Sequence, residues 1–256
     1  MLVFPQLSTG ANAQYPLVRV DANRTVINTL QDGTTVKFED VSASYARWEL
    51  RLDSLDEAER QAIEQLFLAT EGELTAFTLL DPVTNLLTWS EDFTKSVWIF
   101  DPLIAATPGA ADPFGGTAGW QITNSGTAVQ KAAQIIAGPA GFEYCFSVYV
   151  RGIGSVKLMR STDVKTFALT STWQRIFTAG SFSVAGDTFQ VAIALDAGGQ
   201  ADVFGPQLEA QPAAGPYRRS LGDGGVVKVR FESDRLSTTA VGLDRHSSVI
   251  RLVSVE

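Results

Sequence analysis

The sequence has 256 residues, 45% hydrophobic and 19% charged, so it can build real hydrophobic cores and does not have the composition of a disordered chain. Its net charge of -8 argues against nucleic acid or anionic lipid as a partner. No apolar run reaches the roughly 20 residues of a membrane helix, and the N-terminus lacks a signal-peptide pattern. We therefore expect two domains, no membrane segment, and synthesis in the cytoplasm.

The N-terminal part of the chain predicts strands followed by a helix. Residues 17–52 read as short strands separated by turns, with the turn QDGTT between them. In the run ARWELRL, apolar residues alternate with charged ones, which is the period of a half-buried strand, and we expect Trp48 to anchor a core. Ser54 followed by Glu57 is a capping-box pattern and predicts a helix over about residues 55–70.

The rest of the chain predicts strands alone. Residues 88–218 hold many short β-rich runs separated by Gly, Pro, Asn and Asp, which is typical of a jelly roll, and residues 211–225 read as a linker. The strands that follow are too few to fold alone, so we expect residues 1–87 and 222–256 to form one discontinuous domain. The predicted fold is mainly β: a small β-rich domain with one α-helix, interrupted by an inserted β-sandwich.

Two residue types that often carry chemistry are nearly missing. The single cysteine, Cys145, lies in the alternating run FEYCFSVYV and is expected to be buried as a small hydrophobic residue. The single histidine, His246, lies in the turn-like stretch LDRHSS, and there is no second histidine or cysteine to complete a zinc site with it. The sequence therefore favours neither thiol nor zinc nor Ser-His-Asp chemistry.

The N-terminal runs resemble a family of phage virion proteins. The segments YPLVRVDANRTVINTL, WELRLDSLDEAERQAIEQLF and GELTAFTLLDPVTNLL resemble, in this order, the small distal tail proteins of long-tailed bacteriophages and gene transfer agents. In that family a strand and a helix precede a strand end similar to Phe-Thr-Phe-x-Asp-Pro. The matching positions here are Phe77, Thr78, Asp81 and Pro82, while Leu79 departs from the aromatic form.

A second resemblance covers the middle of the chain. It is to the carbohydrate-binding-like jelly rolls of many phage tail and fibre proteins. The segments that carry it are Asn85–Trp98, Tyr144–Gly152, Thr172–Phe182 and Asp202–Ser220.

Together the resemblances imply a virion protein of the phage tail tip, or baseplate. Proteins of this kind form a ring, and we expect a hexamer that contacts the tail tube protein and the tail-tip or hub proteins. A ring follows from one heterologous interface repeated around a closed rotation, which needs no catalytic residue.

If the inserted module binds host-surface glycans, it needs an exposed aromatic side chain to stack on a sugar ring, with polar groups beside it. The candidates are Trp98, Trp120 and Tyr149. The alternative for each is packing in the core, which is also expected for Trp89 and Trp173.

Jelly rolls of this kind often hold a structural calcium ion near their chain ends, bound by oxygen ligands. The candidate ligands are Glu91, Asp92 and Asp202. The alternative is that these are ordinary surface carboxylates, because no closely spaced Asp/Asn loop is present. No other cofactor is predicted.

The sequence leaves three hypotheses about function open. The leading hypothesis is a structural, non-enzymatic tail-tip ring subunit that joins tube to tip and displays the module. The alternative is an accessory protein that binds carbohydrate on the host surface as a receptor. The third is a polysaccharide depolymerase, which requires two carboxylates facing each other about 5 to 9.5 Å apart.

Overall fold

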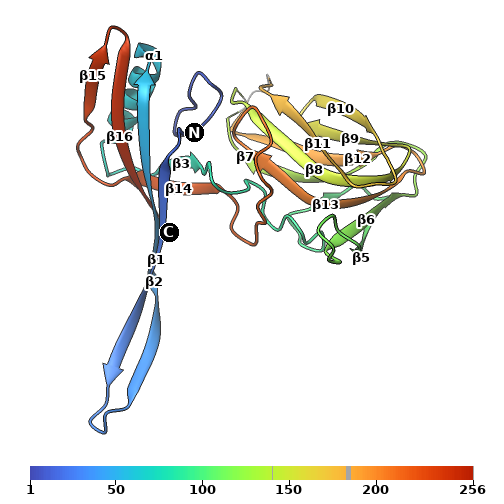
Figure 1. Cartoon of the computed structure of the whole chain (residues 1–256), viewed down its shortest axis with the longest axis horizontal. Helices are drawn as coiled ribbons and strands as arrows, with labels where there is room; N and C mark the ends of the chain where they lie inside the picture. The colour runs from blue at the N-terminus through green and yellow to red at the C-terminus, as the bar shows by residue number, and fades with distance from the viewer. Residues whose placement is uncertain (140, 183–185, 256) are drawn as a thin grey trace. The chain divides into compact units, whose positions relative to one another are not determined.

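The computed structural model describes residues 1–139, 141–182 and 186–255, and it divides into two compact units (Figure 1). The larger unit comprises Met1, Gln6–Asn12 and Leu79–Val227; the smaller comprises Leu2–Pro5, Ala13–Thr78 and the chain from Lys228 onward. The larger unit thus extends beyond the expected module of 88–218 at both ends. The fold is mainly β, as expected, with a β-sandwich and, in the described residues, a single helix.

The smaller unit is built on a six-stranded sheet with the strand order β1-β2-β16-β14-β3, and β15 pairs with β16. Its strands are β1 (Leu17–Thr29), β2 (Thr35–Leu55), β3 (Phe77–Leu80), β14 (Val226–Phe231), β15 (Thr238–Gly242) and β16 (Arg245–Ser254). The alternation expected in β2 is confirmed, because Trp48, Leu50 and Leu52 are all buried. Trp48 lies opposite Leu252 of β16.

Helix α1 (Glu57–Ala69) follows β2 directly. Its capping box is formed by Asp56, whose carboxylate accepts from the Glu59 amide at 2.8 Å, and by Glu59, whose carboxylate accepts from the Asp56 amide at 2.9 Å. The box expected at Ser54 and Glu57 is therefore wrong by two residues. The reason is that β2 continues through Leu55 and Ser54 has a φ of 57°, which is not the extended backbone of an N-cap residue.

The helix packs by its apolar side, with Ile63 and Leu66 buried. Phe67 contacts Phe231 of β14 edge to face at 5.1 Å between ring centroids. No helix in the part of the chain that the structure describes has the length and apolarity to cross a membrane.

The pairing of β1 with β2 continues past the rest of this sheet. β16 pairs with β2 between Arg47 and Leu55, so Thr35–Asp40, Tyr45 and Ala46 have strand partners in β1 alone. We call residues 21–29 and 35–46 the ribbon; it turns at Leu30, whose amide donates to the Thr34 carbonyl. The expected turn is confirmed, but the strands are far longer than the short ones expected, because antiparallel pairing continues on both sides of a register shift at Ala22/Arg24.

The larger unit is a sandwich of two five-stranded sheets, β10-β9-β12-β7-β4 and β11-β8-β13-β6-β5. Its strands are β4 (Ile99–Phe100), β5 (Ile104–Ala110), β6 (Gly119–Asn124), β7 (Gln130–Ala137), β8 (Tyr144–Ile153), β9 (Ser155–Arg160), β10 (Asp163–Ala168), β11 (Gln174–Gly180), β12 (Thr188–Leu195) and β13 (Gln200–Glu209). Every strand pairing within these two sheets is antiparallel.

The core of the sandwich lies between the sheets and takes alternate residues from each strand. In β8 these are Phe146, Val148 and Val150, all fully buried. Cys145 is also buried, as expected, and burial, with a smaller contribution from Glu209, raises the pKa of its thiol to about 12. The thiol is therefore protonated and unreactive at neutral pH.

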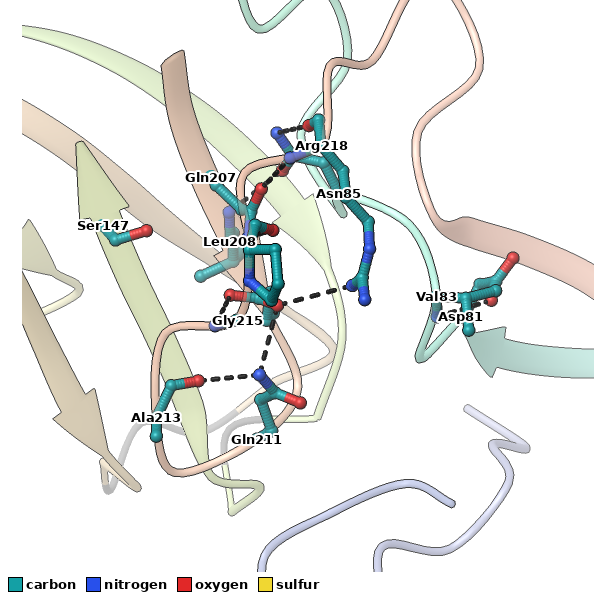
Figure 2. Close-up of polar contacts among 12 residues, drawn as sticks. Asp81, Val83, Asn85, Ser147, Gln207, Leu208, Gln211, Ala213, Gly215 and Arg218 are labelled. Atoms are coloured by element: carbon teal, nitrogen blue, oxygen red, sulfur yellow. Dashed lines mark hydrogen bonds and ion pairs between the residues drawn. The ribbon is translucent and has the colours of Figure 1, made fainter. Parts of the chain in front are cut away.

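Asn85 joins the segment that starts the larger unit to the one that ends it (Figure 2). Its Nδ2 donates to the carbonyls of Pro206 and Arg218 at 2.9 and 3.3 Å, and its Oδ1 accepts from the amides of Leu87 and Leu208 at 3.1 and 3.0 Å. A buried amide side chain with both ends satisfied fixes its surroundings strongly.

The starting and ending segments of the larger unit also pair through their backbones. The Asp81 amide donates to the Gly225 carbonyl at 2.7 Å, and the Gly225 amide donates to the Asn85 carbonyl at 2.8 Å. Within the stretch expected as a linker, the Gly215 amide donates to Glu209 at 2.9 Å, and Figure 2 shows this region lying against the sandwich. The two segments where the chain enters and leaves the larger unit therefore lie side by side.

Candidate functional site

The sheet β11-β8-β13-β6-β5 has one side in the core and one side outside it. Val148 and Val150 of β8 point into the core, so the residues between and after them point outward. We call the side of the sheet that faces away from the core the outer face. The strand register places its outward residues in two rows across the sheet. One row is Arg175, Tyr149 and Phe204, and the other is Arg151, Asp202 and Gln121.

The first row carries a cluster of aromatic rings. The half-buried Tyr149 lies 5.6 Å from Phe114, 6.1 Å from Phe204 and 6.4 Å from Tyr217, measured between ring centroids. Phe204 is buried, but Phe114 is 67% exposed. This aromatic cluster thus has a protected base and an open edge.

The loop that carries Phe114 is held by one carboxylate. Asp112 accepts from the amides of Phe114, Gly116 and Ala118 at 2.8, 3.0 and 3.2 Å. Desolvation opposes ionisation of Asp112, but these amide donors outweigh it and hold its pKa below the ordinary value. Phe114 is therefore exposed on an ordered loop.

Arg175 completes the first row. Its Cζ lies 5.4 Å from the centre of the Tyr149 ring, Nη2 donates to Ser147 Oγ at 3.0 Å, and Nη1 donates to the Gly215 carbonyl at 2.5 Å. These contacts attach the segment after β13 to the sheet, so the guanidinium has a structural role.

The second row contains an ion pair beside a cavity. Arg151 Nε donates to Asp202 Oδ2 at 2.9 Å, and Arg151 Cζ lies 4.9 Å from the centre of the Trp173 ring. The cavity has a volume of about 560 Å³, and its lining includes Gln121, Arg151, Ser171, Gly199, Gln200 and Asp202. Charged, amide and hydroxyl groups thus converge on one hollow.

Two of the three aromatic residues expected at a ligand site lie elsewhere. Trp98 is 4% exposed, stacks on Phe93 at 4.3 Å, and donates its Nε1 to the Trp89 carbonyl at 3.1 Å. Trp120 is 7% exposed and donates its Nε1 to the Glu91 carbonyl at 2.9 Å. Both are corrected to core residues, because neither ring has a free face. Tyr149 lies on the outer face.

The three candidate calcium ligands have other partners. Glu91 accepts from the Tyr217 hydroxyl at 2.8 Å and pairs with Arg219 at 3.1 Å. Asp92 accepts from the Thr94 side chain and backbone, and these bonds lower its pKa. Asp202 pairs with Arg151 on a different strand. Among residues 1–139, 141–182 and 186–255, no three His, Cys, Asp or Glu side chains converge as a metal ligand set.

Sequence reasoning missed Phe114, Arg151 and Trp173. Trp173 was expected in the core, but it is half-buried and lies beneath the Arg151 guanidinium. A signal was present for β8, because Tyr149 and Arg151 alternate with valines that are core residues. Phe114 gave none, since it lies in a loop of small residues.

Comparison with known proteins reaches about half of the chain. No protein-family model matches the sequence, and no curated protein matches it.

The enzymatically active domain of bacteriophage CBA120 tailspike protein 4 has 11% sequence identity and a TM-score of 0.42, over 51% of this chain and 22% of that one. The CBM22-1 xylan-binding domain from Paenibacillus barcinonensis Xyn10C has 16% identity and a TM-score of 0.41, over 52% and 99%. The C-terminal family 22 carbohydrate-binding module of Clostridium thermocellum Xyn10B has 14% identity and a TM-score of 0.40, over 52% and 97%.

Proposed function

We propose that the chain is a non-enzymatic attachment protein of a phage tail tip, whose larger unit binds carbohydrate along the outer face. The observation that carries the proposal is the open aromatic edge at Phe114 and Tyr149 beside the Arg151–Asp202 pair and its cavity. The resemblance of the sequence to phage tail jelly rolls supports the same function.

The chemistry of the outer face suits a sugar. Aromatic rings offer an apolar surface to the C–H groups of a pyranose, and charged and amide groups beside them bind its hydroxyls. Tyr149 and Arg151 are two residues apart on β8, so the rows are separated by about 7 Å. A carbohydrate lying along the strands would contact both rows.

The carboxylates of this face support binding without turnover. Glycoside hydrolysis requires a pair of carboxyl groups across the scissile bond. The two rows of the outer face contain one carboxylate, Asp202, and Arg151 occupies one of its oxygens. We therefore propose retention of the glycan and no catalysis.

The ribbon supports the structural half of the proposal. It is two-stranded with no buried residue in β1, and Ile27 and Phe38 are 58% and 52% exposed. An isolated two-stranded ribbon has little stability of its own, and exposed apolar strands are normally covered in an assembly. We propose that a neighbouring copy covers it in a closed ring, which would contact the tail tube and tip proteins.

Two matched phenylalanine variants test both halves. Phe114→Ala should lower retention on a glycan array, whereas Phe38→Ala should leave it unchanged. Phe38→Ala should instead reduce ring formation, measured by mass photometry and by electron microscopy of the particle, while Phe114→Ala should not.

Absence of binding to any glycan would overturn the carbohydrate half. Release of reducing sugar ends would show a depolymerase instead. A monomer at all concentrations, or density confined to peripheral fibres, would overturn the ring half and favour an accessory receptor-binding protein.

A further inference from the structure

Arg151 has the geometry of a ligand-binding group. Its side chain is 30% exposed, Asp202 holds its Nε, and the Trp173 ring lies beneath it. Nη1 and Nη2 make no hydrogen bond to any residue that the structure describes, and the side chain lines the cavity. The planar terminal edge of a guanidinium is well shaped for paired oxygen acceptors.

Comparison with Arg175 shows that this freedom is particular to Arg151. Both arginines lie on the outer face beside an aromatic ring, but both terminal nitrogens of Arg175 are bonded, to Ser147 and Gly215. Arg175 therefore has a structural role, whereas the terminal nitrogens of Arg151 are available to bind a ligand.

The remaining polar groups of the cavity are equally unoccupied. The side chains of Gln121, Gln200 and Ser171 make no hydrogen bond to other described residues, and all three line the cavity. They supply uncharged donors and acceptors. Ile153, which is 90% exposed, adds an apolar wall.

The charge of the cavity selects among sugars. Its lining carries one cation, Arg151, and one anion, Asp202, so the pair is neutral overall. An alcohol can donate to Asp202 and accept from Arg151, so two neighbouring hydroxyls match the pair. The carboxylate of an acidic sugar would meet Arg151 and be repelled by Asp202 at the same place.

We propose that Asp202 is a specificity-determining residue, which with Arg151 reads neighbouring hydroxyls of a neutral sugar and excludes sugars that carry a carboxylate. This rests on the proposed function, because it assigns the sugar class to the same outer face. Arg151 acts as the donor, Asp202 as the acceptor and as the source of the exclusion.

The test compares one polymer with and without its charge. Affinity gel electrophoresis of the full chain would use polygalacturonate and carboxyl-reduced polygalacturonate, with dextran, mannan and galactan as further neutral probes. The native chain should be retarded by neutral polymers and not by polygalacturonate. Arg151→Gln should lose about tenfold in affinity for the neutral polymers.

Asp202→Asn gives the distinguishing result. It should weaken neutral binding and yet raise the affinity for polygalacturonate relative to its reduced form by about fivefold, because the repulsion is gone. Asp187→Asn removes the same charge from an exposed carboxylate that pairs with the N-terminus outside the cavity, and it should leave the ratio unchanged. Unchanged circular dichroism would show that each variant is folded.

A native chain that prefers polygalacturonate, or an Asp202→Asn variant with an unaltered ratio, would overturn the selection by Asp202 while leaving carbohydrate binding intact. Lack of retardation by every polymer, together with an empty glycan array, would overturn the proposed function itself.

Discussion

The sandwich and the ribbon use the same antiparallel pairing but bury very different shares of their side chains. The β8 strand of the sandwich is buried along most of its length, whereas β1 of the ribbon has no buried residue. Both alternate apolar and polar residues over part of their length. The difference lies in the second sheet, which covers β8 and has no counterpart at the ribbon. Alternation therefore specifies a strand, and a second layer specifies a core.

The largest contrast should come from two phenylalanines in these regions. Phe146 of β8 is fully buried and Phe38 of the ribbon is 52% exposed. Phe146→Ala should lower the free energy of unfolding of the larger unit by about 3 to 5 kcal/mol, because it leaves a cavity. Phe38→Ala should change the free energy of unfolding of the smaller unit by about 0.5 kcal/mol or less. Hydrogen exchange resolved by peptide would measure both, and equal losses would contradict the comparison.

A smaller contrast should come from two asparagines. Asn85→Ala leaves the buried amides of Leu87 and Leu208 without their hydrogen-bond acceptor, so it should lower the stability of the larger unit by about 2 kcal/mol. Asn23 of the ribbon is exposed and accepts from Ser44 at 2.9 Å, and Asn23→Ala should have almost no effect. Urea titration of each variant would measure the loss of stability. A small loss for Asn85→Ala would mean that the ends of the sandwich are held by their backbone hydrogen bonds.

The smallest effect should be a local one at acid pH. Asp112 in the sandwich loop and Asp32 at the ribbon turn both have a lowered pKa, the latter because the Thr34 amide donates to it. A lowered pKa stabilises the folded loop above about pH 3.8, and this stabilisation is lost as the pH falls through the folded value.

Amide NMR shifts of Gly116 and Thr34 should therefore titrate with a midpoint below the ordinary aspartate pKa of about 3.9. Asp112→Asn and Asp32→Asn should each abolish the shift in their own loop and leave the other loop unchanged. A transition of either loop near pH 5 would contradict the hydrogen bonds assigned here.

Much of the fold could be predicted because local patterns determine it. The period around Trp48 gave a strand with one buried face, and the strand-rich middle gave a sandwich. The ribbon could not be foreseen, because exposed and covered strands share the same alternation. The cap of α1 was misplaced by two residues because two overlapping Ser/Asp-x-x-Glu patterns occur there, and the backbone at Ser54 and Asp56 decides between them.

The site was harder to predict because its parts meet only through strand register. Arg151 and Asp202 are 51 residues apart in the chain, and pairing of β8 with β13 brings them together. Trp98 and Trp120 were attractive because tryptophan stacks well on sugars. Their indole N–H groups instead find backbone carbonyls inside the sandwich, which residue type alone does not reveal.

The segments where the chain enters and leaves the larger unit are hydrogen-bonded to each other at Asp81, Asn85 and Gly225, and this has a mechanical consequence. A force that pulls the ends of the larger unit apart would first load these few hydrogen bonds, of which those of Asn85 include partners at the end of β13, Pro206 and Leu208. The end of β13 would be loaded through Asn85, while β8 would bear no tension until these bonds had opened. A unit attached in this way can yield and reclose under load with its outer face intact.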